Sequence, residues 1–217
     1  MPHASPLDLP ARHTEATRLH ELVLPDGTRT ESPVGSFITT HGSSLVFSAP
    51  HEMEHTRDAT QKHAEGGTGA LAARLAALTG GSSIRTDGTQ NGDPNWDDPH
   101  PYAEEALRLA AGGTLVDLHM MLNRGFEVCL GLGPDPSLNR HLWLVLVDEL
   151  LAADVRVSLN WPFGAKGRTL TTRALRAGIP AVQIEMVPEA FDPTSDVFAC
   201  VVSALGRASS VFADPGN

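Results

Sequence analysis

The sequence predicts a single α/β domain with a largely parallel sheet, and three observations lead to that prediction. Apolar segments of strand length alternate with longer segments of helical periodicity through the second half of the chain. The 217 residues suffice for one domain with a full hydrophobic core, and no linker or internal repeat divides them. The hydrophobic content of 41% is that of a globular protein and argues against disorder.

The N-terminal part of the sequence predicts an arm followed by short strands. Residues 1–20 are polar and rich in proline, so we expect an arm there and the domain itself within residues 21–217. The turn signal Pro25-Asp26-Gly27 lies between short apolar segments, which indicates β structure. Residues 44–49 form a candidate buried strand that stops at Pro50.

The middle of the chain carries both helix and strand signals. A helix is expected within residues 56–79, where leucines recur at helical spacing and Gly80-Gly81 ends the pattern. Residues 83–86 favour a short strand, and residues 87–101 are dense in Gly, Asp, Asn and Pro, which predicts a loop. Residues 102–111 are predicted to be helical.

After this loop the alternation of strand and helix becomes regular. We expect strands at residues 114–121, 126–132, 155–159 and 181–186, and helices at residues 136–152, 169–177 and 193–207. Parallel strands must be joined by crossover connections, which are usually helices. The order of these segments therefore indicates a largely parallel sheet.

Charge and terminal sequence exclude several classes of function. The chain has 26 acidic and 16 basic residues, and this net charge of -10 disfavours binding to nucleic acids or anionic membranes. No apolar run approaches the roughly 20 residues that span a bilayer. The N-terminus has no basic start followed by an apolar stretch, so a cytoplasmic location is expected. Cys129 and Cys200 lie in apolar runs, which predicts two buried, reduced thiols.

The segment His51-Glu52-Met53-Glu54-His55 contains three overlapping patterns of metal ligands. His51-Glu52-x-x-His55 is the zincin pattern, and His51-x-x-Glu54-His55 is its inverted form. His51-x-x-Glu54, completed by a distant histidine, is the zinc carboxypeptidase pattern. All three offer imidazole and carboxylate ligands that suit Zn²⁺.

The context of this segment favours the third pattern. The first two need both histidines on a regular helix, one turn apart. A buried strand runs directly into Pro50, so His51 follows the carboxyl end of a strand, where open α/β sheets form their sites. Because Pro50 could also be the first residue of a helix, the zincin interpretation stays open.

Two further strand ends carry polar side chains. Asp117 and His119 are two residues apart, so they point to the same face of the sheet, and His119 could bind a metal while Asp117 orients a ring or a catalytic water. An ordinary solvated strand end is the alternative. Gln183 and Glu185 share a face in the same way. A carboxylate at Glu185, beside a metal-activated water, could act as general base and then protonate a leaving amine.

The chain resembles the N-formylglutamate amidohydrolase family, within the zinc carboxypeptidase-like group that includes succinylglutamate desuccinylase. The resemblance lies in four stretches that occur in the family's order between residues 45 and 190. They are Ser48-Ala49-Pro50-His51-Glu52-Met53-Glu54, Leu115-Val116-Asp117-Leu118-His119, Asn160-Trp161-Pro162-Phe163-Gly164 and Val182-Gln183-Ile184-Glu185-Met186.

The resemblance implies both a fold and a reaction. The fold is a single domain with a mixed, largely parallel central sheet flanked by helices, of the zinc carboxypeptidase-like (phosphorylase/hydrolase-like) type. The resemblance implies that His51, Glu54 and His119 bind zinc and that Glu185 is the catalytic carboxylate. The expected reaction is hydrolysis of a carbon–nitrogen amide bond in a small N-acyl or N-formyl amino-acid-like substrate.

The chain departs from the family at one position. Relatives carry an Asp-Leu-Asn-Arg-like stretch whose arginine helps to bind a substrate carboxylate, and this chain has Trp96 at the matching place in Gly92-Asp93-Pro94-Asn95-Trp96-Asp97. Carboxylate recognition would then fall to other basic residues. The candidates for substrate binding are Arg124, Arg140, Lys166 and Arg168, with His100 as a further residue lining the site.

Two alternative functions remain open at this stage. One is a zinc metallopeptidase, either carboxypeptidase-like or a zincin that uses His51, Glu52 and His55. The other is a non-catalytic binding domain on the same fold. In each enzymatic case the partner is a small-molecule or peptide-like amide, and nothing in the sequence indicates an oligomeric state.

Overall fold

The computed structural model describes residues 28–31, 36–40, 42–88, 90–137 and 139–213. The predicted arm of residues 1–20 lies outside these ranges. In the part of the chain that is described, no helix is both long and apolar enough to cross a membrane.

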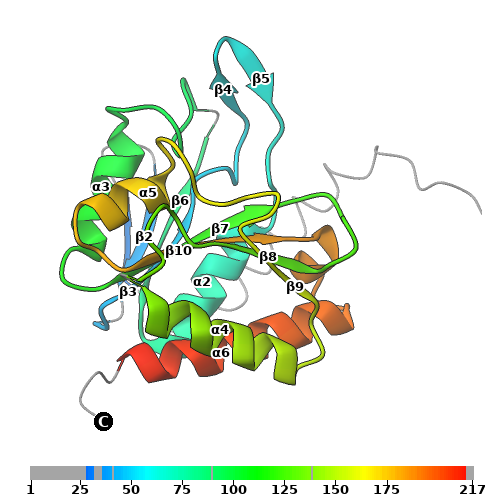
Figure 1. Cartoon of the computed structure of the whole chain (residues 1–217). Coiled ribbons are helices and arrows are strands. Elements are labelled where there is room, and N and C mark those ends of the chain that lie inside the picture. Colours follow the sequence, from blue (N-terminus) through cyan, green and yellow to red (C-terminus); the bar gives the residue numbers. More distant parts are fainter. Residues whose placement is uncertain (1–27, 32–35, 41, 89, 138, 214–217) are drawn as a thin grey trace, which may run out of the picture.

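An eight-stranded sheet forms the centre of the domain (Figure 1). In spatial order its strands are β1 (Thr28–Glu31), β2 (Ser36–Thr40), β6 (Ser82–Thr86), β3 (Leu45–Ala49), β7 (Thr114–Met120), β10 (Ala181–Met186), β8 (Val128–Gly131) and β9 (Val157–Leu159). The pairs β6–β3, β3–β7, β7–β10 and β8–β9 are parallel, and the other three are antiparallel. The predicted mixed, largely parallel sheet in a single α/β domain is thus confirmed.

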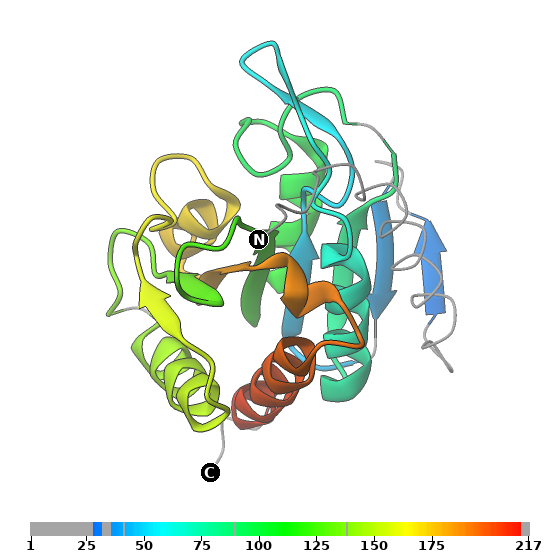
Figure 2. The same cartoon turned by 90° about the vertical axis from the view of Figure 1, so that its right-hand side faces the viewer.

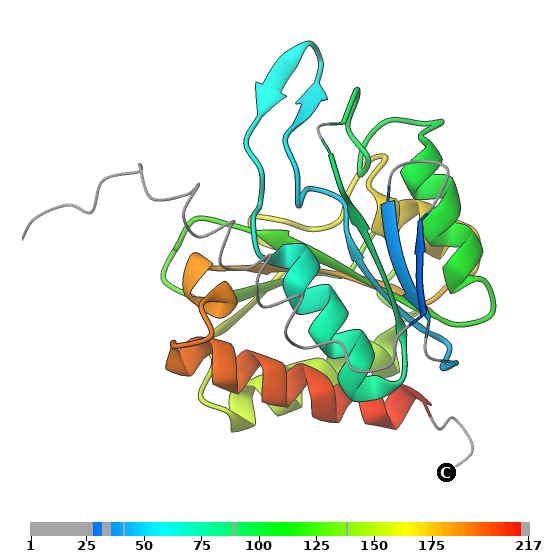
Figure 3. The ribbon, with the colours of Figure 1, turned by 180° about the vertical axis from the view of Figure 1, so that it is seen from behind.

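Helices cover both faces of the sheet. They are α2 (Thr68–Thr79), α3 (Pro101–Ala110), α4 (Arg140–Ala152), α5 (Leu170–Arg176) and α6 (Asp196–Ala213), with a short 3-10 helix η2 (Pro188–Phe191). One core cluster packs α2, α4 and α6 against the sheet, and Figure 3 shows α2 and α6 side by side on that face. A second cluster places α3 and α5 on the opposite face.

The central strands are buried because helices cover them on both sides. Every residue of β3, β6, β8 and β10 is buried, and β3, β8 and β10 accordingly read as mainly apolar runs, whereas β6 is mostly polar. Polar residues inside such strands are costly unless they have partners, so those that do occur mark a site. Both cysteines are free thiols, Cys129 buried on β8 and Cys200 half-buried on α6.

The helix expected within residues 56–79 is half as long as predicted. A hairpin of β4 (His55–Arg57) and β5 (Thr60–Lys62) takes its first part, and α2 begins only at Thr68. The two-residue loop of the hairpin has positive φ angles at Asp58 and Ala59, the conformation that matches the twist of paired strands. The hairpin sequence is polar and offers no apolar face for a helix. Figures 1 and 2 show the hairpin projecting away from the body of the domain.

Parallel pairing brings three strand ends together. The neighbouring strands β3, β7 and β10 run in the same direction, so their carboxyl ends lie at one edge of the sheet. His51 follows β3, His119 lies near the end of β7, and Glu185 lies near the end of β10. The topology therefore gathers these three residues at one edge of the sheet.

Candidate metal site

His51 is buried at the carboxyl end of β3, where its ring has carboxylates on both sides. Its Nδ1 atom lies 3.1 Å from Oε1 of Glu65, and its Nε2 atom lies 2.9 Å from Oδ1 of Asp93. Glu65 belongs to the segment between β5 and α2. Nδ1 of the ring thus faces Glu65, and Asp93 holds Nε2 on the opposite side of the ring.

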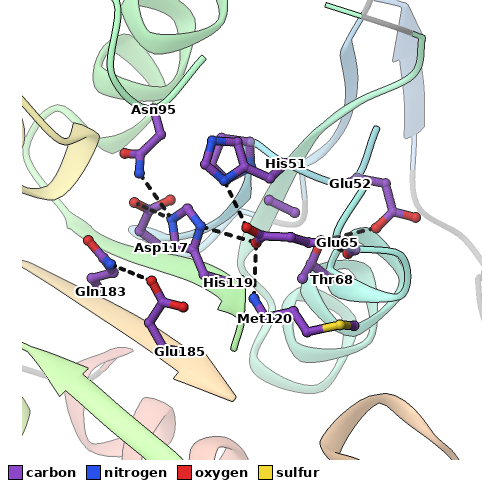
Figure 4. A network of polar contacts seen from close by, with 12 residues as sticks. His51, Glu52, Glu65, Thr68, Asn95, Asp117, His119, Met120, Gln183 and Glu185 are labelled. Carbon is purple, nitrogen blue, oxygen red and sulfur yellow. Dashed lines mark hydrogen bonds and ion pairs between the residues drawn. The ribbon is translucent and has the colours of Figure 1, made fainter. Parts of the chain in front are cut away.

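His119 repeats this arrangement on the neighbouring strand β7. Its Nδ1 atom lies 3.2 Å from Oε2 of Glu65, and its Nε2 atom lies 3.1 Å from Oδ2 of Asp117 (Figure 4). The backbone N–H of Met120 also donates to Oε2 of Glu65, at 2.9 Å. The Glu65 carboxylate therefore lies between the two imidazole rings, with one oxygen directed at each.

The donor set formed by His51, Glu65 and His119 fits a divalent metal ion. One ligand atom from each residue lies within 4.8 Å of the other two. In each histidine a carboxylate holds Nε2, which directs Nδ1 toward the common point, and metal-binding histidines are usually oriented in this way. Two imidazoles and one carboxylate without a cysteine suit zinc.

The electrostatics of the cluster favour a positive charge at this point. Burial works to lower the pKa of His119, but the Asp117 and Glu65 carboxylates outweigh it and raise that pKa well above its ordinary value. Burial works to raise the pKa of Glu65, and His51 and His119 reverse this effect and lower it. Glu65 is thus kept in its ionised form, and a carboxylate must be ionised to bind a metal ion.

A second group, His51, His55 and Asp93, is less suited to a metal ion. The rings of His51 and His55 are stacked with their centroids 4.0 Å apart and an angle of 5° between their planes. Donor atoms of parallel rings point in parallel directions and do not converge on one ion. The Asp93 carboxylate is also paired with the guanidinium of Arg57. Burial, with His51 next, lowers the pKa of His55 to about 4, so its ring is neutral.

Glu54 does not join the cluster that the resemblance assigned to it. Its side chain is exposed and accepts a hydrogen bond from Gln61 at 3.3 Å, because the chain turns after His51 and leaves Glu54 just before β4. Glu65 occupies the place expected for Glu54. No ligand pattern in the sequence pointed to Glu65. Its only distinctive neighbours are the two glycines that follow it, directly before α2 begins at Thr68.

The zincin interpretation loses its structural basis for a similar reason. A turn at residues 50–51 and a bend at residues 52–53 lead to a strand that begins at His55, so the required helix is absent from this described segment. Glu52, the base of that interpretation, accepts hydrogen bonds from the backbone N–H of Gly69 at 2.6 Å and from Oγ1 of Thr68 at 3.1 Å. Its carboxylate thus caps the amino end of α2, where a negative charge is stabilising.

Glu185 lies beside His119 across the parallel pair β7–β10, in which the two residues are in register. Its side chain is buried, and Nε2 of Gln183 donates to its Oε1 at 2.7 Å. Burial raises the pKa of Glu185 to about 7, with Glu65 adding to this and His119 opposing it. A carboxyl group whose pKa lies near neutrality can both accept and return a proton.

The loop from Asp93 to Asp97 forms one wall of the site and is fixed from several sides. Oδ1 of Asn95 accepts the backbone N–H of Leu170 at 2.7 Å, and its Nδ2 lies 3.5 Å from Nε2 of His119. Arg173 donates to the carbonyl oxygens of Asp97 at 2.9 Å and Asn95 at 3.1 Å. Asp93 is therefore presented to His51 by a rigid loop.

The predicted substrate-binding residues are dispersed. Arg124, Lys166 and Arg168 are exposed, and the Arg168 guanidinium lies over the Trp96 ring at 5.5 Å from its centroid. His100 is buried and caps α3, since its Nδ1 accepts the backbone N–H of Tyr102 at 3.2 Å.

Arg140 lies at the opposite end of the strands from the candidate metal site, which excludes a role in substrate binding there. It starts α4, and the preceding Asn139 donates to the carbonyl of Ala181 at the amino end of β10. The candidate metal site lies at the carboxyl end of the same strand. The structure thus separates Arg140 from the site.

Comparisons with known proteins reveal similarity at the level of structure. No family model matches the sequence, and no curated protein matches it. The structure of N-formylglutamate amidohydrolase from Ralstonia eutropha is similar with a TM-score of 0.61 and 13% identity, over 84% of this chain and 98% of that one. The fold of the family that the sequence resembles is confirmed.

Two further structures share this architecture. A bacteriophage poly-γ-glutamate hydrolase has a TM-score of 0.55 and 18% identity, over 83% of this chain and 91% of that one. A metallo-carboxypeptidase from Burkholderia cenocepacia has a TM-score of 0.55 and 12% identity, over 95% of this chain and 69% of that one. At these identities the similarity establishes the fold, and activity has to be argued from the site.

Proposed function

We propose that this protein is a zinc-dependent hydrolase that cleaves a carbon–nitrogen amide bond in a small N-acyl or N-formyl amino-acid-like substrate. One observation carries the proposal. The buried donors His51, Glu65 and His119 converge at the edge of the sheet where a protonatable carboxylate, Glu185, stands beside them. Two proteins of similar fold carry the names N-formylglutamate amidohydrolase and poly-γ-glutamate hydrolase, which agrees with this substrate class.

His51, Glu65 and His119 would hold the ion, and Asp93 and Asp117 would orient the two imidazoles. When bound, a zinc ion held by three protein ligands lowers the pKa of water and polarises the substrate carbonyl. With an ion bound, each imidazole would be neutral, and the carboxylate behind it would keep the proton on Nε2 and leave Nδ1 as the ligand atom. Replacing such partners typically weakens metal binding about 10- to 100-fold.

Glu185 would act as the general base and then as the general acid of the reaction. As base, its carboxylate takes a proton from the attacking water while the oxygen–carbon bond forms. As acid, it then gives that proton to the amide nitrogen as the carbon–nitrogen bond breaks. The pKa near 7 suits both steps, and Gln183, two residues earlier on the same face of β10, holds the carboxylate in place.

The test is Glu185→Gln, with Glu54→Gln as the matched control on an exposed glutamate. We expect Glu185→Gln to keep about one zinc per chain and to lose at least about a hundredfold in kcat. Glu54→Gln should keep both properties. Zinc is measured by atomic absorption, and turnover is measured with N-formyl and N-acetyl amino acids. A Glu185→Gln protein of normal activity would refute the catalytic assignment.

A metallopeptidase is the second candidate function, and the structural similarity to a metallo-carboxypeptidase supports it. Dipeptides with free and blocked termini, assayed beside N-acyl amino acids, separate the two activities. A binding domain without catalysis would turn over neither class, with or without a chelator. Turnover that a chelator abolishes and zinc restores would exclude that alternative.

A further inference from the structure

We propose that Arg57 is a positioning residue of the candidate metal site, which fixes the ring of His51 through Asp93 and couples the β4–β5 hairpin to metal binding. The Nε atom of Arg57 donates to Oδ2 of Asp93, and the other oxygen of this carboxylate lies 2.9 Å from Nε2 of His51. The inference rests on the metal site of the proposed function. It adds to that site an element, the hairpin, that controls its affinity.

The excursion of the chain through the hairpin begins and ends at two donors of the site. The chain leaves His51, forms β4 and β5, and returns at Glu65, whose backbone N–H donates to the carbonyl oxygen of His51 at 2.7 Å. This bond closes the base of the excursion, while the hairpin itself projects from the domain (Figure 2). A displacement of the hairpin would therefore act on both donors at once.

Strand β4 docks on the loop that carries Asp93. The backbone N–H of Thr56 donates to the carbonyl oxygen of Gly92 at 3.2 Å, and that of Gln90 donates to the carbonyl oxygen of Glu54 at 2.8 Å. These two bonds join backbone to backbone, so they place the strand beside the loop. They do not set the direction of the Asp93 carboxylate, which has to be fixed by other groups.

The two oxygens of the Asp93 carboxylate face different partners. Oδ1 accepts two backbone N–H groups of its own loop, at 2.9 and 3.1 Å, besides its contact with His51. Oδ2 faces the hairpin, where Arg57 donates to it and Nε2 of His55 lies at 3.5 Å. Since the His55 ring is neutral, Arg57 is the charged donor of the pair and forms the stronger bond. Arg57 thus holds the carboxylate on the side opposite His51.

The burial of Asp93 makes this cation necessary. The Asp93 side chain is fully buried, whereas that of Arg57 is 33% exposed and stays in contact with water. A buried carboxylate is costly unless a charged or hydrogen-bonding partner compensates it. The guanidinium is itself held in place over the Trp96 ring, 5.4 Å from its centroid. Arg57 therefore allows a charged Asp93 to lie behind His51 in one orientation.

The sign of the effect on metal affinity separates positioning from charge. A cation near the site repels a metal ion, so electrostatics alone predicts that removing the charge of Arg57 would strengthen metal binding. Loss of orientation acts in the opposite direction, because the outer partners of metal-binding histidines typically account for about 10- to 100-fold in affinity. Weaker metal binding without Arg57 is thus the result that only a positioning role predicts.

Zinc affinity is tested first, by competition with a chelating dye. We expect Arg57→Gln to bind zinc about tenfold more weakly than the wild type. Arg57→Lys keeps the charge and should recover part of this loss. The matched control is Arg168→Gln, because the Arg168 guanidinium lies over the same Trp96 ring, 5.5 Å from its centroid, but on a different loop. That variant should bind zinc at least as tightly as the wild type. Circular dichroism checks the fold of each variant.

Reciprocity provides a second test on the wild type itself. If docking of the hairpin favours metal binding, metal binding must favour docking by the same factor. Hydrogen exchange at the Thr56 amide, followed by NMR, should therefore slow about tenfold when zinc saturates the protein. The amide of Ser137, which donates to Asp135 within an exposed turn before α4, is the control and should not respond. In Arg57→Gln the slowing at Thr56 should be smaller.

Unchanged or tighter zinc binding by a folded Arg57→Gln would overturn the proposal. Exchange at Thr56 that zinc does not slow in the wild type would overturn it as well, and this measurement decides if Arg57→Gln does not fold. The proposed function fails separately. Zinc binding that depends on Arg57, in a protein that turns over no amide, would refute the hydrolase and leave the role of Arg57 standing. Normal turnover with zinc binding that is independent of Arg57 would do the reverse.

Discussion

Oε1 of Glu65 lies 3.1 Å from Nδ1 of His51, although fourteen positions and a hairpin separate the two residues in the sequence. The hairpin of β4 and β5 leads the chain away from the sheet edge and returns it, so that Glu65 arrives opposite His51 just before α2 begins. Its other oxygen lies 3.2 Å from Nδ1 of His119. Glu65 thus joins both histidines in one site.

Removal of this carboxylate should release the metal. We expect Glu65→Ala to bind less than a tenth of the zinc that the wild type binds under the same conditions, because one of only three protein ligands is lost. Glu54→Ala should bind as the wild type does, since Glu54 is exposed and outside the site. Zinc content after dialysis is the measurement. Normal zinc in Glu65→Ala, together with loss of zinc in Glu54→Ala, would restore the ligand set expected from the sequence.

The carboxylate behind His119 should tune affinity without being a ligand. Asp117 accepts from Nε2 of His119 at 3.1 Å and from Oγ1 of Thr171 at 3.3 Å. Asp117→Asn preserves size and removes the charge, so we expect zinc affinity to fall about 10- to 100-fold. Competition with a chelating dye measures this change, and circular dichroism checks the fold. Unaltered affinity in a folded variant would mean that Asp117 does not orient the ring.

His55 should be dispensable for the metal. Its ring is neutral and stacks on His51 at 4.0 Å between centroids, a contact that phenylalanine can reproduce. We therefore expect His55→Phe to keep its zinc and most of its kcat, as judged by atomic absorption and by turnover of the best N-acyl amino acid found for the wild type. Loss of zinc in this variant would count in favour of the zincin-type pairing of His51 with His55.

Glu185 should make the stability of the metal-free protein depend on pH. Its pKa rises from 4.5 to about 7 because it is buried. Between these values the folded protein holds a proton that the unfolded chain has released, so the contribution of Glu185 to stability is fully present below pH 4.5 and is lost as the pH rises through about 7.

Glu185→Gln removes this titration. In the presence of a chelator, we expect its Tm to exceed that of the wild type by several degrees at about pH 8 and to differ little at about pH 4.5. Thermal melts at both pH values, with Glu54→Gln as the control, provide the measurement. An equal Tm difference at the two pH values would show that burial of the charged Glu185 is not the cause.

Local patterns were sufficient to predict most of the strands and helices. The segment at residues 181–186 was predicted and found as β10, because an apolar run of strand length between a proline and a turn has few other conformations. The helix within residues 56–79 was predicted too long. The leucine spacing near its carboxyl end indicates a helix there but does not define the residue at which the helix begins. Element ends depend on caps and glycines more than on periodicity.

The sequence by itself determined the α/β class and the placement of His51, His119 and Glu185 at strand ends, because the extent of an apolar strand and the alternation of its side chains are local properties. Only the tertiary structure decided which carboxylate meets the two histidines. Glu54 is three residues from His51 but points to solvent, and Glu65 reaches the site through the hairpin. Which residues converge depends on the three-dimensional path of the chain. The spacing of candidate ligands along the sequence does not define that path.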